Sequence, residues 1–196
     1  MDSLRPLLHE RRSVRAFSDR PVEPDKLRQV LDAAHWASSS ANEQPWRWIV
    51  ATKDDPAQFD RLLQCLLPGN AKWAGAAPVL LLACAERAFA QSGKVNLHAR
   101  HDVGQAMATL ALEADLLGLE THQMAGFEPD KARETFGIPD EYEAVTACAL
   151  GYPGDPESLP DDLKARELAP RTRKPLGELV FGGEWGQAAS FAAGEE

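Results

Sequence analysis

The run 78-PVLLLACA-85 constrains the fold more than any other stretch, because every residue in it is apolar. A strand with one face in solvent alternates apolar and polar residues, whereas a strand covered by helices on both faces need not. The run therefore predicts a central strand of a sheet that carries a helical layer on each side. It is far too short to span a membrane, and it contains Pro78.

Helical and strand-like segments alternate around this run. Apolar residues at helical spacing predict helices over residues 3–10, 21–40, 55–69, 97–117 and 129–137, with a further turn near 159–168. β-forming residues predict strands over residues 46–53, 119–124 and 143–152, and residues 13–17 are expected to be extended. The longest helix carries an apolar stripe that we expect to pack along a partner chain: Val103, Met107, Leu110, Ala114 and Leu117. The alternation indicates a helix-covered sheet.

The size of the chain suits one domain. Its 196 residues are 44% hydrophobic, which is enough to form a real core. We expect residues 1–186 to form a single domain, in which residues 153–183, rich in proline and charge, run over the surface as a C-terminal arm. Residues 187–196 are expected to be a disordered tail.

The charge balance excludes whole classes of partner. The chain has 21 Lys and Arg residues against 30 Asp and Glu residues, for a formal net charge of −9. Nucleic-acid binding and binding to anionic membranes both need a continuous basic surface, so we expect neither. The three cysteines, Cys65, Cys84 and Cys148, form no CxxC pair, and the N-terminus lacks an apolar signal region. These features fit a cytoplasmic protein with no disulfide framework and no metal site.

Two basic clusters stand out in this acidic chain and lie toward its opposite ends. Arg11, Arg12 and Arg15 surround Ser13 in 11-RRSVRAF-17, and 170-PRTRKPL-176 contains Arg171, Arg173 and Lys174. Arginine offers paired donors to phosphate oxygens, so one phosphate dianion held by both clusters would explain them together. The alternative for each cluster is a solvated basic surface, since exposed charges often contribute little.

Other patterns that could carry chemistry are weak. The chain has no G-x-G-x-x-G or G-x-x-x-x-G-K-[ST] nucleotide motif and no G-x-S-x-G nucleophile elbow. His98 and His101 are three residues apart with Asp102 adjacent, but without an obvious third ligand a solvent-facing pair is the favoured interpretation. The polar run 38-SSSANEQ-44 either ends a helix or supplies hydrogen-bonding groups to a ligand.

Six short stretches, taken together and in order, resemble the FMN-dependent nitroreductase family: 11-RRSVRAF-17, 38-SSSANEQPW-46, 69-GNAKW-73, 126-GF-127, 151-GYPGD-155 and 171-RTRKPL-176. The resemblance covers nearly the whole chain. It implies an α+β fold with nitroreductase-like α/β/α layers, in which a central mixed sheet is flanked by helices. It also implies an intertwined homodimer with an FMN at each of two shared interfaces.

The same resemblance implies a cofactor site built from both chains. The phosphate and ribityl chain of FMN would be held by six residues: Arg11, Arg12, Ser13, Arg15, Arg171 and Arg173. The partner chain would contribute four more to the same flavin: Ser38, Ser39, Ser40 and Asn42. Asn70 would hydrogen-bond the pyrimidine edge of the isoalloxazine, and Ala125 and Gly126 would present backbone N–H groups near N5.

Two positions depart from the family pattern, which often has proline where Ser38 stands and glutamate where Ala125 stands. The backbone contact at residue 125 survives such a change, but a carboxylate near the flavin is lost. Redox tuning and substrate choice therefore do not carry over from the family in detail.

In function, the resemblance implies an FMN-dependent NAD(P)H oxidoreductase that reduces nitroaromatic, quinone or similar electrophilic small molecules by ping-pong hydride transfer. Hydride transfer is the chemistry of the flavin, so the side chains need supply no catalytic acid, base or nucleophile. Two alternatives stay open. One is another reaction of the same fold, namely dehalogenation, enone reduction or flavin fragmentation, and the other is a flavin-binding protein without turnover. The physiological substrate and the choice between NADH and NADPH also stay open.

Overall fold

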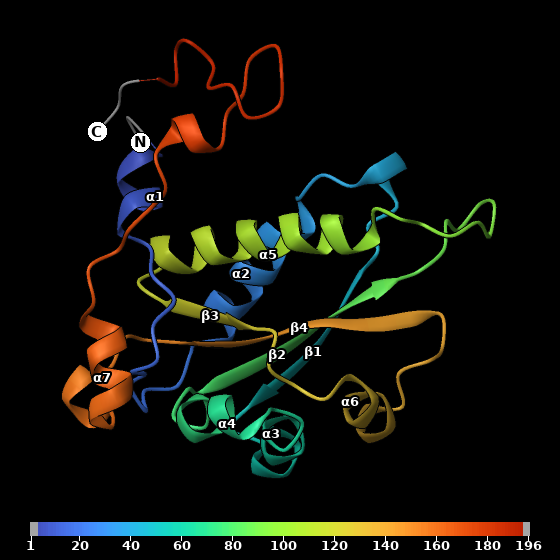
Figure 1. Ribbon diagram of the computed structural model, residues 1–196. Coiled ribbons are helices and arrows are strands. Elements are labelled where there is room, and N and C mark those ends of the chain that lie inside the picture. Colours follow the sequence, from blue (N-terminus) through green and yellow to red (C-terminus); the bar gives the residue numbers. More distant parts are fainter. Residues whose placement is uncertain (1–3, 194–196) are drawn as a thin grey trace.

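The structure is a computed structural model in which residues 4–193 are described. At its centre is a sheet of four strands: β1 (Trp46–Thr52), β2 (Val79–Glu86), β3 (Glu120–Met124) and β4 (Tyr142–Gly151). The order across the sheet is β1-β2-β4-β3, which places β3 at one edge. Figure 1 shows this sheet between two groups of helices. The expected α+β class is confirmed.

The strand directions correct one expectation. All three strand pairings in this sheet, as far as the structure describes the chain, are antiparallel, whereas the expected sheet is mixed. The crossover through α5 (Ala99–Leu116) does return β3 in the same direction as β2, but β4 is inserted between them. The two parallel strands are therefore not hydrogen-bonded to each other.

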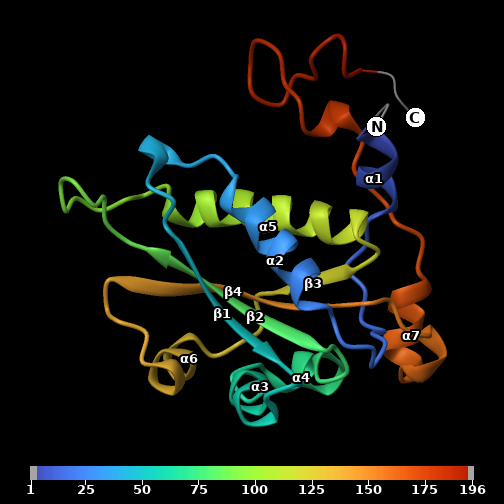
Figure 2. The same cartoon turned by 180° about the vertical axis from the view of Figure 1, so that it is seen from behind.

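Helices cover both faces of the sheet, as the apolar run at 78–85 predicts. On one face lie α2 (Pro24–His35) and α5, and on the other lie α3 (Pro56–Leu63), α4 (Pro68–Ala74) and α6 (Pro129–Phe136) (Figures 1 and 2). Alternate residues of β2 belong to two separate cores: Leu81 and Ala83 pack with α2 and α5, whereas Leu80 and Leu82 pack with the opposite layer. The prediction of α/β/α layers is confirmed.

The apolar stripe of α5 packs into the core of its own chain. Four of its residues are 0% exposed and belong to the core formed with α2 and the sheet: Val103, Met107, Leu110 and Ala114. The expectation that this stripe packs along a partner chain is therefore wrong. An apolar stripe predicts that one face of a helix is buried, but the sheet beneath α5 buries that face as well as a second helix would.

Helix ends follow local signals. The helix expected over residues 55–69 is two helices, because Pro68 begins α4, where the missing N–H of proline costs nothing. Asp55 caps α3 by accepting a hydrogen bond from the Gln58 N–H at 3.1 Å. Gly118 and Gly137 follow α5 and α6 with φ angles of 74° and 63°, in the left-handed region that favours glycine.

The C-terminal arm returns to the start of the chain. It contains η2 (Pro156–Ser158) and α7 (Asp161–Leu168), and then runs to η3 (Leu176–Glu178), which lies beside α1 (Arg5–Glu10) in both views (Figures 1 and 2). Part of the expected tail is described, and there the Ala189 N–H donates to the Val180 oxygen at 3.0 Å. Residues 1–3 and 194–196 lie outside the described residues. Among residues 4–193, no helix is long and apolar enough to cross a membrane.

Candidate functional site

The two basic clusters, far apart in the sequence, meet in the structure. Side chains from both line one cavity of about 260 Å³ at the end of α7, which we call the arginine cavity. Its cationic residues are Arg11, Arg12, Arg166, Arg171 and Arg173. Ser13 lines the same cavity, so the geometry brings five of the six residues expected at a phosphate to one place.

The arginine cavity concentrates positive charge. The pKa of Arg171 is lowered, first by partial desolvation and then by the positive charges of Arg173, Arg11 and Arg12. Since like charges repel when they are held together, a bound anion would stabilise the cluster. A phosphate group fits this requirement, because guanidinium groups bind its oxygens through paired hydrogen bonds.

A buried carboxylate holds the first cluster in place. Glu167, at the end of α7, accepts hydrogen bonds from the backbone N–H of Arg15 at 2.9 Å and of Ala16 at 3.2 Å, and its side chain is 7% exposed. The Arg15 guanidinium pairs with the same carboxylate at 3.8 Å and lies 6.0 Å from the centre of the Trp73 ring. These contacts tie residues 11–16 to the C-terminal arm.

Arg12 and Arg15 have contacts of their own within the chain. The Arg12 guanidinium donates to the carbonyl oxygens of Glu167 at 2.8 Å and Ala169 at 2.7 Å, so it closes the end of α7 while it lines the arginine cavity. Arg15 packs between Glu167 and Trp73 instead. Arg171 and Arg173 also have contacts within the chain, since Arg171 donates to the carbonyl oxygen of His9 and Arg173 donates to that of Thr172 at 2.7 Å. Arg15 is the one expected phosphate ligand that does not line the arginine cavity.

The sequence does not single out two residues of this site, Arg166 and Glu167. Both lie on α7, where the sequence indicates only one helical turn rich in charge. One signal does exist for Glu167: it follows the buried Leu163 by four residues, so helical spacing places both on one face. Its residue type alone does not distinguish it from the exposed acids around it.

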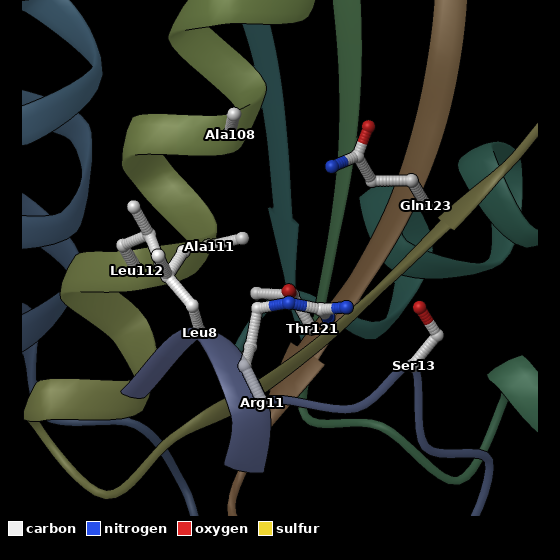
Figure 3. A pocket seen from close by; sticks show the side chains of 8 residues that line it. All are labelled: Leu8, Arg11, Ser13, Ala108, Ala111, Leu112, Thr121 and Gln123. Atoms are coloured by element: carbon white, nitrogen blue, oxygen red, sulfur yellow. The ribbon is translucent and has the colours of Figure 1, made fainter. Parts of the chain in front are cut away.

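A second cavity of about 340 Å³ adjoins the arginine cavity and shares Arg11 and Ser13 with it. Its other lining residues come from α1, α5 and β3: Leu8, Ala108, Ala111, Leu112, Thr121 and Gln123. In Figure 3 the α5 side chains lie on one side of it, and Gln123 of β3 lies on the other. We call it the β3 cavity. A mostly apolar lining with a few polar groups is typical of small-molecule sites.

Beyond the end of β3, the backbone of Gly126 comes close to α4. Its carbonyl oxygen accepts hydrogen bonds from the Leu67 N–H and from Asn70 Nδ2, both at 3.0 Å. A Cβ atom at residue 126 would lie 2.6 Å from Asn70 Nδ2, so only glycine allows this approach without a shift. Asn70 therefore fixes the turn that carries Ala125 and Gly126, and Ala125 is exposed beside it.

The polar loop expected to serve a partner chain lies at the other end of α5. Ser38 Oγ donates to Gln105 Oε1 at 2.7 Å, and the Ser40 N–H donates to the buried Asp102 at 3.0 Å, near the start of α5. Arg11, in contrast, acts on Asp115 near the end of α5. α5 has 18 residues, a length of about 27 Å. One chain therefore does not bring this loop and its own arginine cavity together.

The loop also has an uncommon backbone conformation. Ala41, Asn42 and Gln44 have φ angles of 51°, 57° and 49°, in the left-handed region that non-glycine residues seldom adopt. Ser39 helps to hold it, because its Oγ accepts a hydrogen bond from the Gln44 N–H at 3.0 Å. Residues Ser38, Ser39, Ser40 and Asn42 thus form one ordered loop rather than a frayed helix end.

The histidine pair of the sequence lies beside this loop. His101 Nδ1 is 3.3 Å from Asp102 Oδ1, and the His98 and His101 rings meet edge to face with centres 6.4 Å apart. Over residues 4–193, no group of three or more His, Cys, Asp or Glu side chains is arranged to hold a metal ion.

The sequence and the fold of this chain are both similar to those of known proteins. The model of the nitroreductase family matches residues 8–152, which run from α1 into the residue after β4. A crystal structure described as an oxidoreductase containing FMN aligns with a TM-score of 0.87 and 38% identity, covering 92% of this chain and 91% of that one.

Two further relatives point the same way. An NADH dehydrogenase of Thermus thermophilus is 31% identical over 204 residues, covering 88% of this chain and 92% of the relative. A protein of Bacillus subtilis named FMN reductase [NAD(P)H] is 28% identical over 165 residues, covering 76% of this chain and 65% of the relative. The family match spans the first arginine cluster, the polar loop, Asn70 and Gly126. The chain belongs to the nitroreductase family.

Proposed function

We propose that the protein is an FMN-dependent NAD(P)H oxidoreductase that reduces nitroaromatic, quinone or similar electrophilic small molecules by ping-pong hydride transfer. The observation that carries the proposal is the arginine cavity, where cations from distant parts of the chain meet beside the mostly apolar β3 cavity. The names of the FMN-containing neighbour and of the Bacillus subtilis FMN reductase [NAD(P)H] support FMN as the cofactor and a nicotinamide as the reductant.

The residues present fit FMN along its length. Arg11, Arg171 and Arg173 suit the phosphate, and Thr121 and Gln123 offer polar groups where the ribityl chain would follow. From Thr121 the strand and its following turn run about 16 Å to Gly126, which suits an extended molecule. At that end the glycine leaves the backbone bare, and a Cβ there would collide with Asn70.

Bound FMN would supply the two-electron chemistry between a nicotinamide and an acceptor. The work of the chain is then to hold the phosphate, to fix the Gly126 turn through Asn70, and to leave one face of the ring open. Two of its thiols are poor nucleophiles, because burial raises the pKa of Cys84 to about 11 and that of Cys148 to about 12. All three cysteines are free, which favours a reducing cytoplasm as its location.

We further propose an intertwined homodimer in which the polar loop of each chain completes the flavin site of the other. The solvent side of α5 offers a surface for this association, since small or apolar residues recur on it every four positions: Gly104, Ala108, Leu112 and Leu116. Leu4 and Leu8 near α1 add to it and are 48% and 49% exposed. An apolar face of this kind is typical of a surface covered by a second copy.

The test is a pair of half-reactions on the purified protein. We expect a flavin absorption spectrum that is bleached anaerobically by NADH or NADPH, and that returns when a nitroaromatic compound or a quinone is added without nicotinamide. Yellow protein that no nicotinamide bleaches would support a flavin-binding protein without turnover instead. Protein that binds no FMN when reconstituted would overturn the proposal.

A further inference from the structure

The flavin chemistry does not require the carboxyl group of Glu120, yet this group interacts with Arg11 and with the backbone of Arg12, in the first basic cluster. It is the first residue of β3, and its Oε2 atom is buried without a hydrogen-bond partner among the described residues. An unpartnered buried carboxylate oxygen is costly, because it has lost its water without gaining a donor. Its presence beside a cationic cavity therefore calls for an explanation.

Charged groups from three elements act on this carboxyl. The pKa of Glu120 is raised to about 7, first by burial and then by the negative charge of Asp115, near the end of α5. The positive charge of Arg11 and a hydrogen bond from the Arg12 backbone act in the opposite direction, and the negative charge of Glu167 on α7 adds a smaller increase. Protonated and ionised forms are therefore close in free energy near neutral pH.

Arg11 connects this carboxyl to the ligand site. Its guanidinium lines the arginine cavity and also acts electrostatically on Glu120. A phosphate dianion in the cavity would also interact with the positive charge of Arg11, and it would add negative charge near Glu120. The ionised carboxylate and the dianion therefore compete, whereas a neutral carboxyl and the dianion do not.

We propose that Glu120 is a positioning residue of the phosphate site that takes up one proton from solvent when a phosphate dianion binds in the arginine cavity. The identity of the ligand as FMN rests on the proposed function above. The proton adds to the carboxylate of Glu120, which becomes a neutral carboxylic acid, and Arg11 is released to the phosphate. Phosphate affinity is then set in part by pH through a residue that does not touch the ligand.

The direction of the effect follows from linkage. Ligand binding raises the pKa of Glu120 above its value of about 7 in the free protein. Below that value the group is protonated in both states and affinity is at its maximum. As the pH rises through the pKa of Glu120 in the free protein and then through its pKa in the complex, phosphate affinity falls. Each unit of difference between these two pKa values corresponds to about a tenfold change in affinity.

The experiment compares FMN dissociation constants of the wild type and Glu120→Gln from pH 6 to pH 9, by quenching of flavin fluorescence. Glutamine imitates the neutral acid, so the variant should bind FMN about three- to tenfold more tightly than the wild type at pH 9 and equally well at pH 6. The phosphate of FMN has its own ionisation near pH 6, but it is common to both proteins and cancels in their ratio. Riboflavin, which lacks the phosphate, should give a ratio that does not change with pH.

A second measurement needs no variant. Calorimetric titration of the wild-type protein with FMN at pH 7.5, in two phosphate-free buffers of different ionisation enthalpy, should show net proton uptake. Glu10→Gln is the matched control, because Glu10 is exposed and adjacent to Arg11 in the sequence, and this change should leave the uptake intact. FMN binding without proton uptake, or a wild-type to Glu120→Gln ratio that is constant with pH, would refute the role of Glu120. Failure of FMN to bind at every pH would instead refute the proposed function.

Discussion

Replacing Glu167 with glutamine would test how residues 11–16 are held against the C-terminal arm. The carboxylate accepts hydrogen bonds from the backbone N–H groups of Arg15 and Ala16 and pairs with the Arg15 guanidinium. Glutamine keeps an acceptor oxygen at the Oε1 position, which both backbone N–H groups can use, but it presents an NH2 group in place of Oε2. The Arg15 N–H then loses its second acceptor, and the Arg15 guanidinium loses its ion-pair partner. A hydrogen bond to a charged group contributes about 1.5–3 kcal/mol, and a buried donor left unpaired costs a similar amount. Since the Glu167 side chain is 7% exposed, solvent offers little compensation, and we expect a loss of about 1.5–3 kcal/mol from the removal of the charge.

The assay is urea unfolding of the flavin-free protein, followed by tryptophan fluorescence and by far-UV circular dichroism. The midpoint should fall with an unchanged slope, and the melting temperature should drop by about 2–4 °C for each kcal/mol lost in a chain of this size. Glu134→Gln on α6 is the matched control, because Glu134 is exposed and its replacement should change stability by less than about 0.5 kcal/mol. If the midpoint of Glu167→Gln lies within that same margin of the wild type, then Glu167 does not hold the segment as argued.

Three further predictions concern other parts of the molecule. Arg171→Ala or Arg173→Ala should weaken FMN binding about ten- to a hundredfold, with riboflavin binding unchanged, as measured by fluorescence titration. Met107→Ala should cost about 2–5 kcal/mol in urea unfolding, because Met107 is 0% exposed within its own chain, and the elution volume of the folded protein should stay the same. The pKa of Glu23 is lowered from 4.5 to about 2, mainly by the hydrogen bond from Tyr152, so that stabilisation is present above pH 4.5 and is lost as the pH falls toward 2. Tyr152→Phe should flatten this acid dependence of the urea midpoint.

The layered fold could be predicted because the sequence of one strand indicates it. An apolar residue at every position of 78–85 requires burial on both faces, and β2 does divide its side chains between two cores. An apolar pattern does not indicate which surface will cover the apolar residues. The stripe on α5 specifies a buried face, but only the fold decides that its own sheet covers Met107. The antiparallel pairing could not be predicted for the same reason. It depends on the position of β4 between β2 and β3, which are far from each other in the sequence.

The arginine cavity could be expected because two short runs of cations are conspicuous in an acidic chain. Glu167 and Glu120 could not be found in this way, since each is one of many acids in the sequence. Their environments come from contacts between distant segments: α7 against residues 15 and 16 for Glu167, and β3 against residues 11 and 12 for Glu120. An acid becomes functionally unusual through what surrounds it, and tertiary structure alone supplies the surroundings.

The strained polar loop bears most directly on the proposed homodimer. Three left-handed, non-glycine residues at positions 41, 42 and 44 cost on the order of 1–3 kcal/mol each, and such strain is kept where surrounding contacts enforce it. Here those contacts are with Asp102 and Ser39, and Asp102 lies about 20 Å along α5 from Asp115, the residue on which Arg11 of the same chain acts. A rigid, polar loop at that distance has no use at its own phosphate site. In a dimer formed through the exposed side of α5, the same loop would meet the flavin of the other chain, and the strain would pre-organise it for that role. Dissociating the dimer should then weaken FMN and riboflavin binding alike, because the loop would bind the ring, which both molecules share, and not the phosphate.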